Sequence, residues 1–150
     1  MDLGLEGKTA VITGGSRGIG KYIARALARE GCDLAICARG ADTLEETASE
    51  LRAIGAEVVA VPMDITDDGA PAELIETAAA RLGGLDVLVN NVGGNRRKPF
   101  VELTDQDWED LIELNFMSHE RCSHEAISHM RQAGAGTIIF ISTILARETG

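Results

Sequence analysis

The segment Thr13-Gly14-Gly15-Ser16-Arg17-Gly18-Ile19-Gly20 is the most informative part of the sequence. The apolar run before it, Ala10–Ile12, is too short for a helix and rich in β-branched residues, so it predicts a buried strand. Residues 21–30 carry apolar side chains at positions 23, 24, 27 and 28, which form one face of a helix. A glycine-rich turn between a strand and a helix start presents free N–H groups and the positive end of the helix dipole to an anion.

The spacing of the glycines separates several phosphate-binding patterns. Glycines at 14, 18 and 20 give G-x-x-x-G-x-G, which differs from the G-x-G-x-x-G dinucleotide fingerprint. The segment 15–22 is one residue away from the P-loop G-x-x-x-x-G-K-[ST], but Tyr22 stands where a P-loop needs a small hydroxyl group for Mg²⁺. A phosphotransfer site and a plain glycine-rich turn are the alternatives at this point.

Length and composition limit the class of protein. A chain of 150 residues is the size of one domain, 1–150, and its net charge of −10 argues against a nucleic-acid partner. No apolar run approaches the length of a membrane span, and Met1–Gly4 lacks a basic leader pattern, so we expect a cytoplasmic protein without membrane association. The three cysteines lack metal-ligand spacing, which predicts buried reduced thiols and no metal site.

Predicted strands and helices alternate along the chain. The expected strands span 9–13, 33–38, 57–61, 85–90 and 137–141, and the expected helices span 18–30, 41–54, 71–82 and 104–132. The last helix begins with a capping-box pattern at Thr104 and Asp107. Apolar strands that alternate with helices predict a doubly wound, Rossmann-like parallel sheet in three α/β/α layers that ends after the fifth strand. Ligands of such folds bind at the carboxyl ends of the strands.

Two further motifs stand at those carboxyl ends. Asn90-Asn91-Val92-Gly93 follows the fourth strand, where amides can hold a neighbouring strand and a glycine lets a flat ring pass the backbone. Asp64 follows the third strand, where its carboxylate can close a turn. T-G-x-x-x-G-x-G at 13–20, N-N-x-G at 90–93 and the Asp between them resemble the classical short-chain dehydrogenase/reductase family. The general run of the sequence is similar to its 3-oxoacyl-carrier-protein reductase branch.

The resemblance implies a nicotinamide dinucleotide and a set of residues that bind it, with Asp64 at the adenine amino group. An NAD site usually places an acid after the second strand, whereas Arg39 stands there and Arg17 lies in the glycine loop. Two guanidinium groups suit a 2′-phosphate, so the sequence favours NADP(H) over NAD(H), although Asp42 lies nearby. The predicted cofactor residues are Gly14, Ser16, Arg17, Gly18, Ile19, Gly20, Arg39, Asp64, Ile65, Asn91, Val92 and Gly93.

The resemblance also implies catalytic residues. In a regular helix Asn115 lies in the middle of an apolar stripe that runs from Trp108 to Ala126, either as a structural amide or, as the family implies, as the holder of a water in a proton relay. Thr143 stands where the family has its catalytic Ser, and its hydroxyl could bind a substrate carbonyl. Ser142 should point to the opposite face of the strand.

The family's Tyr-x-x-x-Lys segment does not occur in the sequence, whose only tyrosine is Tyr22. We therefore expect the chain to be the N-terminal part of an oxidoreductase that acts on a small carbonyl or alcohol compound and assembles as a dimer or tetramer. The fifth strand would then be an unpaired apolar edge. A nucleotide-binding module without catalysis is the alternative.

Overall fold

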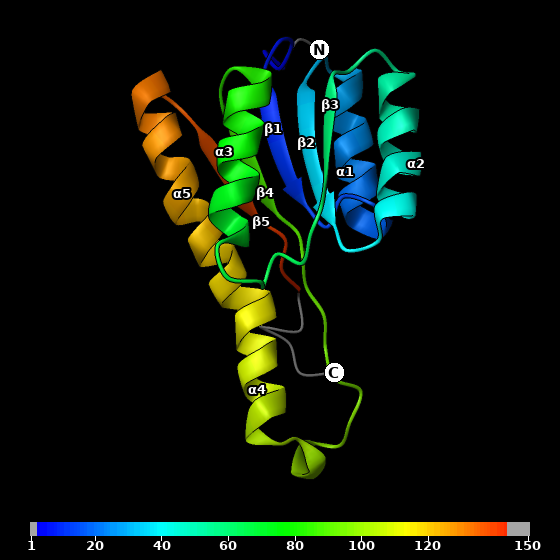
Figure 1. Cartoon of the computed structure of the whole chain (residues 1–150), viewed down its shortest axis with the longest axis vertical. Helices are drawn as coiled ribbons and strands as arrows, with labels where there is room; N and C mark the ends of the chain where they lie inside the picture. The colour runs from blue at the N-terminus through cyan, green and yellow to red at the C-terminus, as the bar shows by residue number, and fades with distance from the viewer. Residues whose placement is uncertain (1–2, 144–150) are drawn as a thin grey trace.

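The structure is a computed structural model that describes residues 3–143. Five parallel strands form one sheet in the order β3-β2-β1-β4-β5 (Figure 1). The strands are β1 Thr9–Thr13, β2 Asp33–Ala38, β3 Val58–Pro62, β4 Val87–Asn90 and β5 Thr137–Phe140. The chain steps outward from β1 in one direction through β2 and β3, then returns to the other side for β4 and β5. This order confirms the predicted doubly wound, Rossmann-like fold.

Helices cover both faces of the sheet. The helical segments are α1 Gly18–Arg29, α2 Ala41–Arg52, α3 Ala70–Leu82, η1 Phe100–Glu102, α4 Asp105–Ile112, η2 Glu113–Met117 and α5 Ser118–Ala133. Helices α1 and α2 lie on one side of the sheet and α3 and α5 on the other, while α4 and η1 extend beyond the carboxyl ends of the strands (Figure 1). In the described part of the chain, no helix is long and apolar enough to cross a membrane.

The alternation of side chains along the strands builds two cores. Ala10 and Ile12 of β1 pack with α1 and α2, whereas Val11 between them packs with α3 and α5. All three are fully buried. The strand is apolar at consecutive positions because helices cover both faces of the sheet, as expected for a parallel sheet.

Strand β5 lies at the edge of the sheet, as predicted. Ile139 and Phe140 are 41% and 55% exposed, so the strand presents apolar side chains beside an open backbone edge. The strand ends at Phe140, one residue before the predicted end, and β4 begins at Val87, two residues after the predicted start. Just before β4, the carboxylate of Asp86 accepts the backbone N–H of Thr9 at 2.9 Å.

The prediction of one regular helix over 104–132 is wrong. The structure has α4, a π-helical segment η2 and then α5. A π turn leaves i→i+4 carbonyls without their usual partners, and side chains bind two of them here. Asn115 donates Nδ2–H to the carbonyl of Leu111 at 2.9 Å, and the Ser118 hydroxyl donates to the carbonyl of Leu114 at 2.8 Å.

The π segment also breaks the predicted apolar stripe. Cys122 and Ala126 of α5 are fully buried, but Trp108 and Ile112 of α4 are 44% and 53% exposed. Helix α4 extends beyond the carboxyl ends of the strands, whereas α5 packs on the sheet, so the positions of the predicted stripe do not share one buried face (Figure 1). The start of α4 is as predicted, since Thr104 and Asp107 form the reciprocal capping box.

Candidate functional site

A cleft of about 470 Å³ opens at the carboxyl ends of the strands. It lies where the order of the sheet reverses between β1 and β4, which is the usual ligand site of doubly wound folds. Its walls come from the glycine loop, the ends of β2 and β3, the start of α2, the residues after β4 and one residue of η2. The lining residues are Gly14, Ser16, Arg17, Ile19, Cys37, Ala38, Arg39, Gly40, Thr43, Met63, Asp64, Ile65, Asn91, Val92, Gly93 and Leu114.

Most of the predicted cofactor residues line this cleft, and the two exceptions belong to the glycine loop. Gly18 and Gly20 lie outside the wall. A Cβ atom on Gly20 would lie 2.2 Å from the carbonyl oxygen of Gly14, so glycine is needed there for close packing beneath the loop. Gly14 itself has φ +68°, a conformation that only glycine adopts readily. No side chain caps the start of α1 at Arg17, so backbone N–H groups at this helix start are available to an anion.

Asn91 and Val92, which follow β4, are bound to the glycine loop through Thr13. The Thr13 hydroxyl, which is buried, accepts the backbone N–H groups of Asn91 at 2.9 Å and Val92 at 3.1 Å. The Asn91 side chain donates in return to the carbonyls of Thr13 at 2.9 Å and Gly14 at 3.2 Å. These four hydrogen bonds join the first and fourth strand ends, so the two motifs found in the sequence form one structural unit.

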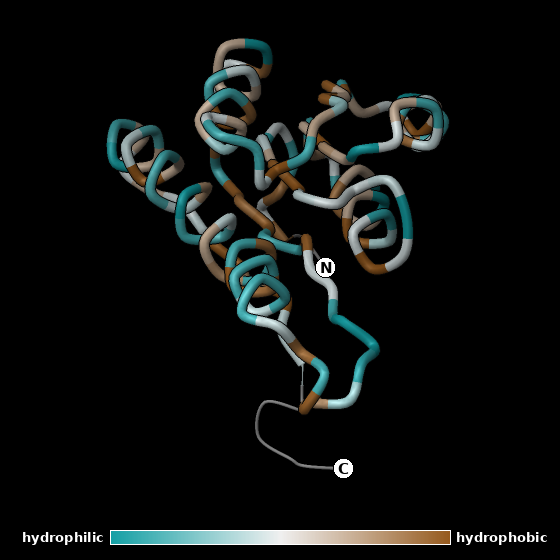
Figure 2. Tube along the Cα trace, turned by 60° about the horizontal axis from the view of Figure 1, so that its bottom comes forward, coloured by the Kyte–Doolittle hydropathy of each residue, from teal (hydrophilic) through white to brown (hydrophobic). Residues whose placement is uncertain are grey.

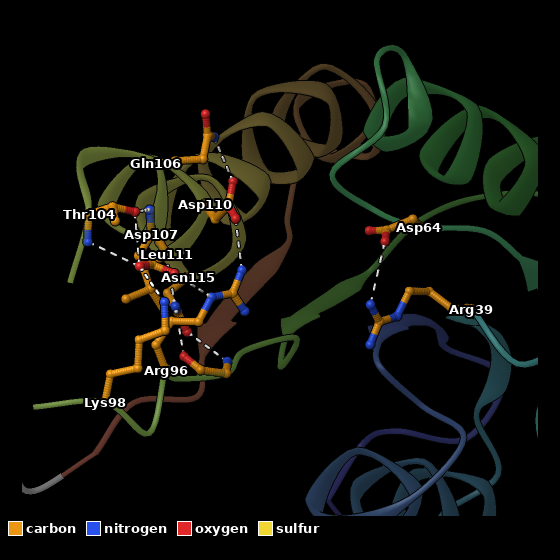
Figure 3. Close-up of polar contacts among 11 residues, drawn as sticks. Arg39, Asp64, Arg96, Lys98, Thr104, Gln106, Asp107, Asp110, Leu111 and Asn115 are labelled. Atoms are coloured by element: carbon orange, nitrogen blue, oxygen red, sulfur yellow. Dashed lines mark hydrogen bonds and ion pairs between the residues drawn. The ribbon is translucent and has the colours of Figure 1, made fainter. Parts of the chain in front are cut away.

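Two side chains of opposite charge meet at the other end of the cleft (Figure 3). Arg39 follows β2 and Asp64 follows β3, with Nη1 and Oδ2 3.8 Å apart. The Arg39 side chain is 75% exposed, so this ion pair contributes little to stability and leaves the guanidinium group accessible. The other carboxylate oxygen of Asp64 accepts the backbone N–H and the hydroxyl of Thr66, which confirms the predicted turn-closing role. Among residues 3–143, Arg17 belongs to no ion pair.

The basic loop after β4 is tied to α4 (Figure 3). Residues 95–98 form a hydrophilic stretch between Gly94 and the apolar η1 (Figure 2). Lys98 and Arg96 bind Asp107 at 2.8 and 3.4 Å, and Arg96 also binds Asp110 at 2.8 Å. The hydrogen bond from Lys98, with those from Thr104, holds the pKa of Asp107 well below its usual range. Two of the three cations in this loop are thus neutralised within the chain.

Asn115 lies beside the cleft, not within a buried face. The residue is exposed, and its side chain holds Gly94 from both sides, accepting the Gly94 N–H and donating to the Gly94 carbonyl at 3.0 Å each. A Cβ atom on Gly93 would lie 3.0 Å from Asn115 Oδ1, which shows how closely this amide approaches the cleft wall. The prediction that Asn115 lies within an apolar face is wrong, because the residue is exposed. Its contacts fit a structural amide, and its part in a proton relay stays a prediction.

Thr143, the other predicted catalytic residue, follows β5 by three residues. It is exposed and lies outside the wall of the cleft. Its role is a prediction that rests on the position after the strand.

The described residues contain no group of His, Cys, Asp or Glu that could hold a metal ion. All three cysteines are buried and free. Burial raises the pKa of Cys37, which lines the cleft, to about 11, and that of Cys122 to about 12. Such thiols stay protonated near neutral pH, so Cys37 forms part of the wall and is a poor nucleophile there.

Comparison with known proteins decides the family. A sequence model of the "short chain dehydrogenase" family matches residues 8–150. The chain belongs to the short-chain dehydrogenase family. Similar relatives of this family include the 2-dehydro-3-deoxy-D-gluconate 5-dehydrogenase of Escherichia coli K12, 37% identical over 97% of this chain.

Solved structures of short-chain dehydrogenases superpose closely on the chain. L-sorbose reductase from Gluconobacter frateurii, complexed with NADPH and L-sorbose, has a TM-score of 0.94 and 36% identity over 98% of the chain. A 7α-hydroxysteroid dehydrogenase complexed with NADH and 7-oxo glycochenodeoxycholic acid has a TM-score of 0.93 and 34% identity over 97% of the chain. The chain spans 57% of the length of the Escherichia coli relative, and 56% and 57% of these two structures.

Sequence reasoning missed six residues of the cleft wall. Four of them lie within two positions of predicted residues at the ends of β2 and β3, so the rule that ligands bind at strand ends could have found them. The other two come from α2 and η2, and no sequence signal places those segments over the cleft. The missed residues are Cys37, Ala38, Gly40, Met63, Thr43 and Leu114.

Proposed function

We propose that the chain forms the NADP(H)-binding part of a short-chain oxidoreductase, which moves a hydride between nicotinamide C4 and a carbonyl or alcohol carbon. The observation that carries the proposal is the arrangement of the cleft. A glycine loop and an uncapped helix start form one wall, and an accessible Arg39 stands at the end of β2. NADPH and NADH in the related L-sorbose reductase and hydroxysteroid dehydrogenase support a nicotinamide dinucleotide as the ligand.

The residues present fit such a group. Backbone N–H groups of the loop around Ser16 and Gly18 would hold the pyrophosphate at the start of α1. Arg39 and Arg17, which both line the cleft, would bind a 2′-phosphate, and Asp64 and Ile65 would border the adenine. A dinucleotide site requires close approach of the protein backbone to the ligand. Gly93 lines the cleft and has no side chain, so it permits this approach.

Asn91, Val92 and Gly93 would border the nicotinamide half at the opposite end of the cleft. When bound, the nicotinamide ring supplies or accepts the hydride, and the protein orients it. Asn115 would hold the loop after β4 in place through Gly94. Thr143 would direct its hydroxyl to the reacting oxygen. The substrate is a small carbonyl or alcohol compound, with a 3-oxoacyl group as one candidate, and the complete protein is a dimer or tetramer.

Fluorescence titration of the full chain with NADPH and NADH tests the proposal. We expect NADPH to bind more tightly than NADH, and Arg39→Gln to weaken NADPH about 10- to 100-fold with little effect on NADH, because a charge-assisted hydrogen bond is lost. Arg29→Gln, at the far end of α1, is the matched control and should change neither affinity. Failure of the chain to bind either nucleotide would refute the proposal. Binding without reduction of any carbonyl in a broad panel would favour the nucleotide-binding module.

A further inference from the structure

His119 is a buried side chain that the proposed cofactor site does not use. It lies on α5, one turn after Asn115, and is only 7% exposed. Its ring atom Nε2 lies 2.7 Å from the carbonyl oxygen of Val92, in the segment that follows β4. A carbonyl can only accept a hydrogen bond, so Nε2 must carry the proton and donate it.

The next turn of α5 also binds Asn90, the last residue of β4. The Asn90 side chain donates to the Ser123 hydroxyl at 3.0 Å, and that hydroxyl donates to the carbonyl of His119 at 2.7 Å. Asn91 between them turns to Thr13 and the glycine loop. Helix α5 therefore restrains the residues on both sides of Asn91, and the restraint on Val92 depends on the His119 ring.

The ring also lies near an aromatic side chain. Its centroid lies 6.0 Å from that of Phe140 in β5, with the two planes tilted by 43°. A buried imidazole with a hydrogen bond and an aromatic neighbour has restricted rotation in the folded chain, so its hydrogen bond costs little further ordering. The Nε2 donor is therefore oriented in the chain without a ligand.

We infer that His119 is a positioning residue that turns the Val92 carbonyl toward α5 and so shapes the end of the cleft where the nicotinamide half would lie. This inference rests on the proposed function. Val92 and Gly93 both line that end, whereas Arg39 lies at the adenosine end. Without the imidazole donor, the carbonyl of the half-buried Val92 has to find another partner, and the peptide between Val92 and Gly93 is free to rotate toward the cleft.

Two substitutions with side chains of similar length test the inference. His119→Gln keeps an N–H at the position of Nε2, and His119→Met replaces it with a methyl group on a flexible chain of similar size. The probes are NADPH and 2′,5′-ADP, which carries the adenosine half alone. We expect His119→Met to weaken NADPH about 5- to 20-fold and to leave 2′,5′-ADP within about twofold, and His119→Gln to stay within about threefold for both.

Three results would overturn the inference: equal weakening of both probes by His119→Met, unchanged NADPH binding, or the same loss in the Gln variant. If the Met variant does not fold, nitrogen-15 NMR of the wild-type imidazole decides, because a ring protonated only at Nδ1 cannot donate to Val92. A wild-type chain that binds neither probe refutes the proposed function itself. If the wild-type chain binds both probes and His119→Met leaves both affinities unchanged, only the role of His119 is refuted.

Discussion

Replacing Thr13 by Val exchanges one buried hydroxyl for a methyl group and keeps the size of the side chain. The hydroxyl accepts two backbone N–H groups, from Asn91 and Val92, so both lose their acceptor. An unsatisfied buried donor costs about 1–3 kcal/mol, and the lower half of that range applies because both residues are partly exposed. We expect Thr13→Val to lower the free energy of unfolding by about 2–4 kcal/mol for the two donors together, or the melting temperature by roughly 5–15 °C.

Urea denaturation of the full chain measures this effect, with Thr13→Ser as the matched control. The Ser variant keeps the hydroxyl and loses one methyl group, which should cost about 1 kcal/mol. The dependence on urea should keep the same slope in both variants, since neither changes the surface exposed on unfolding. A Val variant as stable as the Ser variant would refute the reasoning, because it would show that the hydroxyl does not hold the two strand ends together.

Three further predictions concern packing, acid stability and the thiols. Gly20→Ala should cost about 2 kcal/mol or more, because its Cβ would overlap the Gly14 carbonyl. Gly84→Ala, whose Cβ would lie in ordinary contact 3.9 Å from Thr9 Oγ1, should leave urea stability unchanged or slightly raised. Burial alone would raise the pKa of Asp86, but hydrogen bonds from Lys8 and β1 outweigh it and lower the pKa. Its stabilisation is therefore complete above about pH 4 and lost as the pH falls through the lower folded value, so Asp86→Asn should flatten the stability curve at acid pH; an unchanged curve would contradict this. At pH 8, Ellman's reagent should label no cysteine in the folded chain and all three in urea, since burial raises the pKa of each; fast labelling of the folded chain would disprove it.

Local patterns were sufficient for most of the fold. The alternation of apolar strands and amphipathic helices predicts the parallel sheet, because strands covered on both faces must be apolar at every position. The predicted start of α1 at Gly18 and the capping box at Thr104 agree with the structure because both depend only on neighbouring residues. The helix over 104–132 was predicted wrongly because its periodicity was counted at 100° per residue, and a π turn has no clear sequence signal.

The positions of the residues at the strand ends, including the two arginines of the cleft, could be read from the chain alone, because a parallel sheet brings all carboxyl ends to one edge. The contacts that hold those strand ends together depend on the packing of distant segments. Thr13, Asn91 and His119 come from segments far apart in the sequence, and their hydrogen bonds follow from the distance between strands and from the rotation of α5 after the π segment. Such distances depend on how whole elements pack against each other, and no local pattern of residues records them.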